Sequence, residues 1–286
     1  MAQAQDKPST QPAQPGGETF LRFVHDVDAN TGHLDAAVVS YVNSDGVVVN
    51  LVSAVHVGDK AYYERLNKLF KTYDSLLYEM VKPKDAEVPQ PGQAGGAISF
   101  LQRALKNVLG LQFQLDAIDY SAGNFVHADL DADTFHRMQS ERGESLIGLM
   151  LQQMLREMAS EDANVKDPDL QTAEFLAALT SPDRPRQLKL LIAEQFEDLD
   201  KKLAGLDGPD GSVLLTERNK AAIRTLKKQL AKGDKSIGIF YGAAHMGDLS
   251  KRVEAMGFKV SKREWLTAWD MSAPKEPVTT PAVKQE

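Results

Sequence analysis

Cysteine is absent from this chain of 286 residues, which excludes disulfides, thiolate catalysis and cysteine-ligated metals. Long apolar runs are absent as well. No stretch reaches the roughly 18 apolar residues that a membrane-spanning helix needs, so the sequence predicts no such helix. Basic residues are outnumbered, with 33 Lys and Arg against 40 Asp and Glu and a net charge of -7. That balance argues against nucleic acid or an anionic membrane as the main partner.

The two ends of the chain have the composition of disordered segments. Residues 1–17 are polar and rich in Pro, Gln and Ala, and residues 272–286 form a Pro-containing tail. The chain between the tails is long enough for a sizeable core. With the tails placed at 1–18 and 272–286, we expect a single α/β domain over residues 19–271, carrying a helical insertion at about 98–206.

The N-terminus bears on localisation. The start of the sequence has no charged segment followed by an apolar one, so we expect no signal peptide in it. Ala2-Gln3-Ala4-Gln5 still resembles what remains of an exported chain after a signal peptide is cut. The sequence thus agrees with a periplasmic or secreted protein and, alternatively, with a cytoplasmic one. The absence of cysteine does not distinguish these compartments.

The stretch from Val47 to Glu79 predicts a strand, a helix and a second strand. Val47 to Val55 is almost continuously apolar, as in a strand that is buried on both faces. Asp59 is placed as the N-cap of a helix, and a short apolar run over Ser75 to Tyr78 follows that helix. His56 and Glu79 therefore lie just past the carboxyl ends of two strands, where open α/β sheets bind ligands.

A similar motif returns near the other end of the chain. Ser236 to Tyr241 is apolar and β-rich, and it leads through GAAHMGD into a second predicted helix. Written beside SAVHVGD, which contains His56, this segment shares the Ala, the His, the Gly and the Asp in one register. His245 thus occupies the topological position of His56. The second copy continues through Phe258-Lys259-Val260 and has no acid that matches Glu79.

The remaining pattern completes an α/β fold. Ala36 to Val42 predicts a strand, and Asn43-Ser44-Asp45-Gly46 predicts a hairpin turn, so an antiparallel hairpin at the edge of the sheet precedes the central strand. Trp265 to Trp269 predicts a last strand. Apolar stripes at helical spacing dominate residues 98–206 and indicate helix packing rather than a substrate groove. We predict a central mixed, mainly parallel sheet from two related βαβ-containing halves, with a large helical insertion.

Within the insertion, His127 and Asp129 share a face of an extended strand, which suits a metal or an oriented acid–base pair. The alternative, which we favour, is that Asp129, Asp131 or Asp133 caps the next helix and that His127 is an ordinary histidine. His25, His33 and His136 have no companion pattern and receive no role.

Arg218 is a further candidate. A helix is predicted to start with Thr216 as its N-cap, which places Arg218 in the first turn, where the helix dipole disfavours a cation. An arginine at such a position needs a carboxylate or a ligand to contact. Either a role in the site or a plain surface ion pair would satisfy this requirement.

His56, Glu79 and His245 form the central candidate site. Two imidazoles and a carboxylate at strand ends are a usual ligand set for a catalytic divalent metal, which lowers the pKa of bound water from about 15.7 to roughly 7. Without a metal, the same residues can form an acid–base set in which Glu79 takes a proton from water. The plainest alternative is that each His only caps its strand. Asp59 and Asp248 are expected to cap helices.

These residues resemble the motifs of the Tiki/TraB/GumN superfamily. The resemblance covers roughly Phe20 to Trp269 and is carried by two GxxH-like motifs, by Glu79, by Glu217-Arg218-Asn219 and by the ending GAAHMGDL. It implies an α/β fold related to erythromycin esterase and to haem-binding ChaN-like proteins. For some members it also implies divalent-metal-dependent proteolysis that clips the N-termini of peptides or proteins.

By this resemblance, the functional residues are His56, Glu79, Arg218 and His245. Ser53 stands where the first motif of the family has Gly, and Ser can adopt an ordinary strand conformation there. We expect a hydrolase that uses Mn, Co or Zn and acts on peptides or protein N-termini. The two His and Glu79 would surround the metal or its water, and Arg218 would hold a substrate carboxylate or an oxyanion. The alternatives are a non-catalytic protein that binds a peptide or haem, and a metal-free esterase.

Overall fold

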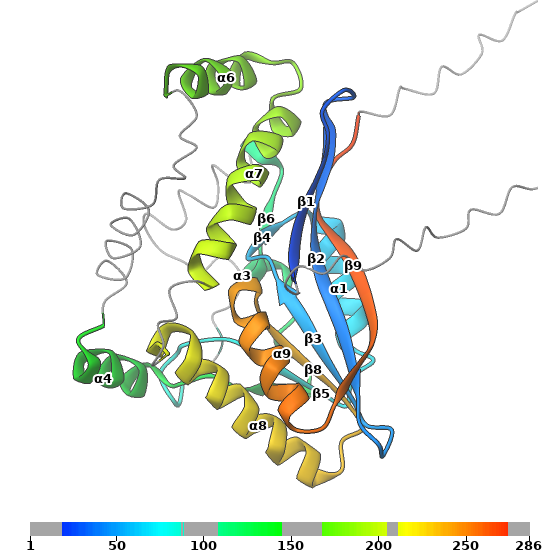
Figure 1. Cartoon of the computed structure of the whole chain (residues 1–286), viewed down its shortest axis with the longest axis vertical. Helices are drawn as coiled ribbons and strands as arrows, with labels where there is room; N and C mark the ends of the chain where they lie inside the picture. The colour runs from blue at the N-terminus through cyan, green and yellow to red at the C-terminus, as the bar shows by residue number, and fades with distance from the viewer. Residues whose placement is uncertain (1–18, 87, 89–107, 145–167, 205–210, 274–286) are drawn as a thin grey trace, which may run out of the picture.

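The computed structural model describes residues 19–86, 88, 108–144, 168–204 and 211–273 (Figure 1). The predicted tail at 1–18, most of the tail predicted at 272–286 and parts of the insertion predicted at about 98–206 lie outside these residues. In the part that is described, the fold is α/β as predicted. No helix within that part is long and apolar enough to cross a membrane, which agrees with the sequence.

A sheet of seven strands forms the centre of the described structure. Six of them pair in the order β1 (Leu21–Asp26), β2 (Thr31–Val42), β3 (Val48–Ala54), β8 (Ser236–Gly242), β5 (Ser75–Tyr78) and β7 (Phe125–His127), and β9 (Lys259–Met271) also pairs with β2. β2 is antiparallel to β1, β3 and β9, whereas β3, β8, β5 and β7 are parallel. β2 therefore runs against all the other strands of the sheet. The predicted mixed, mainly parallel sheet is confirmed.

Helices cover both faces of the sheet. α1 (Lys60–Phe70) lies on one face, and α8 (Arg218–Lys232) and α9 (Met246–Ala255) lie on the other (Figure 1). α7 (Arg184–Ala204) contacts β1 and the short 3-10 turn η2 (Ala243–His245). The other described elements are α3 (Gln114–Ala117), α4 (Ala132–Arg142), α6 (Pro168–Thr180), the π-helical turn η1 (Val213–Glu217), and the strand pair of β4 (Val57–Gly58) with β6 (Gln112–Phe113).

Alternate side chains of β8 belong to two different cores. Ile237, Ile239 and Tyr241 pack in the core that includes α8 and α9. Phe240 points to the opposite face and packs on Phe70 of α1, with 4.8 Å between the ring centroids. A strand that is covered on both faces has to be apolar at nearly every position, which is the pattern that predicts β3 and β8.

The strand order assembles the candidate site. β8 lies between β3 and β5, with Ala54 paired to Gly242 and Tyr78 paired to Phe240. The carboxyl ends of these three parallel strands are therefore nearly level. His56 and Glu79 follow β3 and β5, and His245 ends the turn η2 that follows β8, so the two copies of the motif lie on adjacent strands and the carboxylate comes from the next strand.

The hairpin of β2 and β3 does not lie at the edge of the sheet, contrary to the prediction. β9 pairs with β2 from Gly32 to Val42 and forms the edge instead. This strand is also longer than predicted, since it begins at Lys259 and includes the predicted last strand, Trp265 to Trp269. Two register shifts along the pairing and the exposed polar side chains of an edge strand hide its length from local pattern reading.

The start of the helix that carries Arg218 also differs from the prediction. Ser212, not Thr216, is the N-cap, because the Leu215 N–H donates to the Ser212 hydroxyl (3.1 Å). The turn η1 then continues directly into α8. Arg218 therefore follows a complete helical turn, and the dipole argument about a first-turn cation does not apply to it.

Candidate functional site

Glu79 occupies the middle of the site. Its Oε1 accepts from Arg218 Nη2 (2.7 Å) and its Oε2 accepts from the Gly242 N–H (2.6 Å). Burial alone would raise the pKa of this carboxyl. The neighbouring imidazoles, the Arg218 guanidinium and the Gly242 N–H outweigh burial and lower the pKa from 4.5 to about 2. Glu79 is therefore an anion at neutral pH.

A buried arginine links Glu79 to a second carboxylate. Nε and Nη2 of Arg218 donate to Oδ1 and Oδ2 of Asp129 (3.0 and 2.6 Å), and the Arg218 side chain is 9% exposed. Burial would lower the pKa of the guanidinium, but the two carboxylates raise it above its ordinary range. Of the two roles open to Arg218, a plain surface ion pair is thus wrong, because this ion pair is buried. Two anions and one cation leave the cluster negative.

His245 is 4% exposed, and Asn219 and Asp248 fix its orientation. Its Nδ1 lies 2.7 Å from Asn219 Oδ1, and Asn219 Nδ2 donates to Asp248 Oδ2 (2.8 Å). Because a carboxylate only accepts, the amide nitrogen faces Asp248 and the amide oxygen faces the imidazole. Nδ1 of His245 therefore carries the proton, and Nε2 keeps its lone pair 3.6 Å from Glu79 Oε1. Burial, partly opposed by Glu79, lowers the pKa of His245 below 6.5.

His56 is exposed but is held in a similar way. Its Nδ1 lies 3.0 Å from Gln114 Oε1, and Gln114 Nε2 donates to the Tyr120 hydroxyl (2.9 Å). The Gln114 N–H also donates to the His56 carbonyl (2.9 Å), which fixes the start of α3 against the His56 loop. In this arrangement the amide oxygen accepts the Nδ1–H of His56, and Nε2 is the nitrogen with the lone pair.

Gly242 leaves open the space at which these groups meet. A Cβ placed on Gly242 would lie 3.4 Å from both His56 Nε2 and Glu79 Oε2, and 3.8 Å from His245 Cδ2. A side chain at this position would fill that space. Ser53 holds the corresponding position in the first motif, inside β3, where it is 1% exposed and its hydroxyl has no hydrogen-bond partner within the described residues.

The donor set suits a divalent metal. It offers two imidazole nitrogens with lone pairs and one ionised carboxylate, and metal ligands have to be deprotonated. Two donors about 2.1 Å from a tetrahedral ion lie roughly 3.4 Å apart. Nε2 of His245 and Oε1 of Glu79 are 3.6 Å apart. This distance is too long for a hydrogen bond but close to the spacing of two ligands of one ion.

The site is not fully arranged around an ion. Among the described residues, no three His, Asp or Glu side chains are already spaced to share one. A third donor therefore requires the movement of a side chain. His56 is the exposed member of the set and has the most room to move.

The end of α4 supports the turn from which Arg218 and Asn219 emerge. Glu144 Oε2 accepts from the Val213 N–H (2.7 Å), and Arg142 Nη2 donates to Glu217 Oε1 (2.7 Å). These contacts hold the π-helical turn η1 at both of its ends. Such turns recur at functional sites, because they change the direction of the side chains that follow.

The two motif aspartates do not cap helices with their side chains, contrary to expectation. Asp59 takes the N-cap position of α1 but makes no side-chain capping bond. Its Oδ1 instead pairs with Lys189 Nζ of α7 (2.6 Å), and its Oδ2 accepts from the Asp270 N–H (2.6 Å). Asp248 lies inside the first turn of α9 and holds Asn219.

The cluster of His127 and Asp129 separates into different roles. Asp131 caps α4 and accepts from the Thr134 N–H (2.9 Å), as one alternative predicts. His127 Nε2 lies 2.7 Å from the Met80 carbonyl, an ordinary structural contact. Asp129 is not a cap but the bidentate partner of Arg218, and the preferred interpretation of the sequence misses this role.

Asn219 and Gln114 are also missed as members of the site. Asn219 follows Arg218 directly in the quoted motif, so its position is a signal that can be read. Gln114 is 58 residues from His56 and belongs to no motif. Only the pairing of β4 with β6 brings it near.

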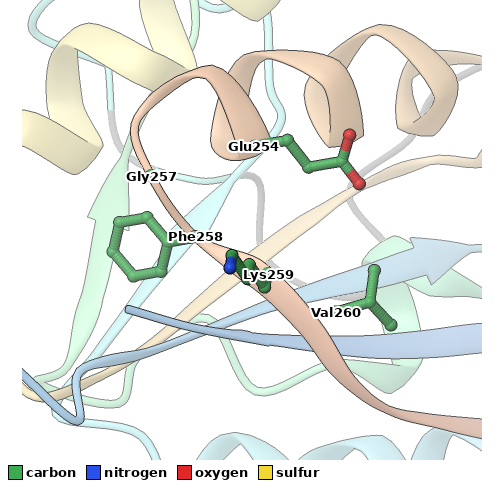
Figure 2. A pocket seen from close by; sticks show the side chains of 5 residues that line it. All are labelled: Glu254, Gly257, Phe258, Lys259 and Val260. Carbon is green, nitrogen blue, oxygen red and sulfur yellow. The ribbon is translucent and has the colours of Figure 1, made fainter. Parts of the chain in front are cut away.

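A shallow hollow of about 400 Å³ lies away from the site. Glu254, Gly257, Phe258, Lys259 and Val260 line it (Figure 2). These residues lie at the C-terminal end of α9 and the start of β9, whereas His245 directly precedes the N-terminal end of α9. The hollow therefore shares no residue with the His and Glu cluster.

No protein-family model matches this chain, and no curated protein or solved structure matches it either. The resemblance to the Tiki/TraB/GumN superfamily therefore remains a prediction from the motifs.

Proposed function

We propose that the protein is a divalent-metal-dependent hydrolase, with His56, Glu79 and His245 at its active centre. The observation that carries this proposal is the pair of imidazoles whose Nδ1 atoms are each bound to a side-chain amide. Metal-ligating histidines commonly donate their other N–H to a second group, which fixes the tautomer. With the amide oxygens facing both Nδ1 atoms, both Nε2 lone pairs are available beside an ionised carboxylate.

The protonation states favour metal ligation over metal-free acid–base catalysis. A general base works best when its pKa lies near the working pH. Glu79, with its pKa lowered to about 2, is a weak base for water, and the pKa of His245 is lowered as well. An ionised carboxylate and neutral imidazoles are, however, the forms that bind metals.

In this proposal three residues bind the metal and one positions a ligand. His56 and His245 would hold the ion through Nε2, and Glu79 would hold it through a carboxylate oxygen. Bound there, Mn²⁺, Co²⁺ or Zn²⁺ would supply a Lewis acid that polarises a carbonyl and lowers the pKa of water toward neutrality. We assign Arg218 the role of fixing Glu79, because its Nε and Nη2 already contact carboxylates of the protein. This role replaces the binding of a substrate carboxylate or an oxyanion.

We propose peptides or protein N-termini as the substrates. This choice rests on the resemblance of both His motifs, Glu79 and Arg218 to the Tiki/TraB/GumN superfamily. The exposed side of the site at His56 supports it, because an extended chain needs access from solvent.

Calorimetry with Mn²⁺, Co²⁺ and Zn²⁺ tests the metal. We expect stoichiometric binding to the wild type and none to the double variant His56→Ala/His245→Ala. The matched control is His25→Ala/His136→Ala, which removes two exposed imidazoles that belong to neither motif and should bind as the wild type does. Peptide-library cleavage with the bound metal then tests the reaction.

A wild type that binds none of the three ions would contradict the metal-dependent mechanism. Turnover that survives a chelator would point to the metal-free esterase, and saturable binding of peptide or haem without turnover would point to a binding protein.

A further inference from the structure

We propose that Asn219 and Gln114 are positioning residues that select the tautomers of the two site histidines. Each amide oxygen accepts an Nδ1–H, so that Nε2 of the same ring is left unprotonated toward Glu79. The use of these tautomers in metal binding rests on the proposed function. Their geometry, however, concerns only side chains of this chain and can be tested without a metal.

The orientation of Asn219 is obligatory. Its Nδ2 donates to Asp248 Oδ2 (2.8 Å) and to the His245 carbonyl (3.4 Å), and both of these oxygens can only accept. Rotating the amide would set Oδ1 against two acceptors in a place where Asn219 is 0% exposed. Asp248 is itself held by Arg252 Nε (2.5 Å). His245 therefore has one available tautomer, with the proton on Nδ1.

The orientation of Gln114 is conditional. Its Nε2 donates to a hydroxyl, that of Tyr120, and a hydroxyl can donate as well as accept. Burial raises the pKa of Tyr120 to about 12, so the hydroxyl keeps its proton at neutral pH. If Tyr120 donates instead, the amide turns over and presents its NH₂ to Nδ1 of His56. Nε2 then carries the proton and cannot bind a metal.

The two amides thus give the site one fixed ligand and one adjustable ligand. Neutral His245 offers a lone pair at Nε2, while neutral His56 offers it only in one of two hydrogen-bond patterns. This difference agrees with the burial of the rings, since His245 is buried and His56 is exposed.

Nitrogen-15 NMR of the imidazoles in the metal-free full chain is the direct test. In the wild type, we expect His245 and His56 to carry the proton on Nδ1, with the signals assigned from the single variants His56→Ala and His245→Ala. Gln114→Met should move the His56 proton to Nε2, whereas Gln114→Glu, which still accepts from Nδ1, should keep it on Nδ1. Gln187→Met is the matched control, because Gln187 pairs with Asn30 on another surface.

For His245, Asn219→Leu removes the acceptor and should release the tautomer. Because Asn219 is buried, that variant can fail to fold, so Asp248→Asn provides a second route. It replaces the acceptor-only group with an amide and should allow both tautomers of His245. Metal affinity should fall about 10- to 100-fold in Asn219→Leu, Asp248→Asn and Gln114→Met, and less in Gln114→Glu.

Two results would overturn the inference. One is a wild-type proton on Nε2 of His245. The other is a set of tautomers that stay unchanged in both Gln114→Met and Asp248→Asn. Tautomers that respond as expected in a protein that binds no metal would uphold the positioning role and reject the proposed function, so the two failures are distinguishable.

Discussion

The two halves of the site share one motif but have different surroundings. His245 is buried, and its amide partner is fixed by a carboxylate. His56 is exposed, and its amide partner contacts a hydroxyl. The motif aspartates diverge in the same way, since Asp248 turns toward Asn219 and Asp59 turns toward Lys189 of α7. The repeated motif thus determines which strand ends carry a histidine, and tertiary contacts determine how firmly each histidine is held.

The two halves also differ in how much a substitution should cost in stability. The His245 half adjoins the ion pairs of Arg218 with Glu79 and Asp129, whose side chains are at most 13% exposed, and buried charges are costly to leave unpaired. In the His56 half, Gln114 and Tyr120 are neutral and His56 is exposed, so changing one of these side chains leaves no buried charge unpaired. We therefore expect the largest loss of stability from a variant that removes a buried charge. Variants that change His56 or only the space between the rings should change stability little.

The largest effect should follow Arg218→Met. Removing this cation leaves Glu79 and Asp129 buried and uncompensated, so we expect the free energy of unfolding to fall by about 3–5 kcal/mol. Urea denaturation measures the loss. The control Arg137→Met breaks an ion pair with Glu141 in which both side chains are 61% exposed, and it should cost less than about 1 kcal/mol. Equal midpoints for the two variants would refute the contrast between buried and exposed charges.

Next in size is Glu79→Gln, whose effect should depend on pH. Because the pKa of folded Glu79 is lowered from 4.5 to about 2, its ionised form stabilises the fold above pH 4.5, and this stabilisation is lost as the pH falls toward 2. The shift corresponds to at most about 3 kcal/mol. Urea denaturation over a pH series should show the wild type more stable than Glu79→Gln at neutral pH, with the difference shrinking between these two values. A difference that does not change with pH would show that Glu79 is not held ionised.

Replacing each histidine by Gln compares the halves directly. His245→Gln disturbs a buried hydrogen-bond network with Asn219 and should cost about 1–3 kcal/mol. His56→Gln changes an exposed side chain and should stay within about 0.5 kcal/mol. Thermal and urea unfolding measure both. If His56→Gln proves as costly as His245→Gln, the two rings are held equally and the comparison fails.

Gly242→Ala should also change stability little, although its effect on the site is specific. The backbone of Gly242, with φ -53° and ψ 147°, suits Ala, so we expect a change below about 1 kcal/mol. Its methyl group would enter the space among His56, Glu79 and His245 and should abolish metal binding in calorimetry. Gly247→Ala is the control, because a Cβ there contacts nothing within 4 Å. Unchanged affinity in Gly242→Ala would place any bound ion elsewhere.

Local sequence was sufficient to predict the elements that carry the site. The apolar run before His56 and its counterpart before His245 predict β3 and β8, because a strand covered on both faces is apolar throughout. The position of Glu79 follows from the same argument applied to β5. These predictions need only the pattern within each segment.

What the sequence did not reveal depends on pairing between distant segments. β9 extends along β2 in a register that no local pattern encodes, and Gln114 reaches His56 only through the small β4 and β6 pair. The sequence offers Asp129 two local roles, a partner of His127 or a helix cap, and its ion pair with Arg218 of α8 is a third role that neither describes. Side chains that orient the site residues are, for this reason, harder to predict than the site residues themselves.

The start of α8 couples the positions of two groups of the site. Arg218 and Asn219 are consecutive residues, and they serve different groups: Arg218 holds Glu79, and Asn219 holds His245. Any displacement or rotation of the start of this helix would move the carboxylate and the imidazole together. Mutations along α8 that are remote from both should therefore be epistatic with Glu79 and His245 at once, while leaving His56 independent.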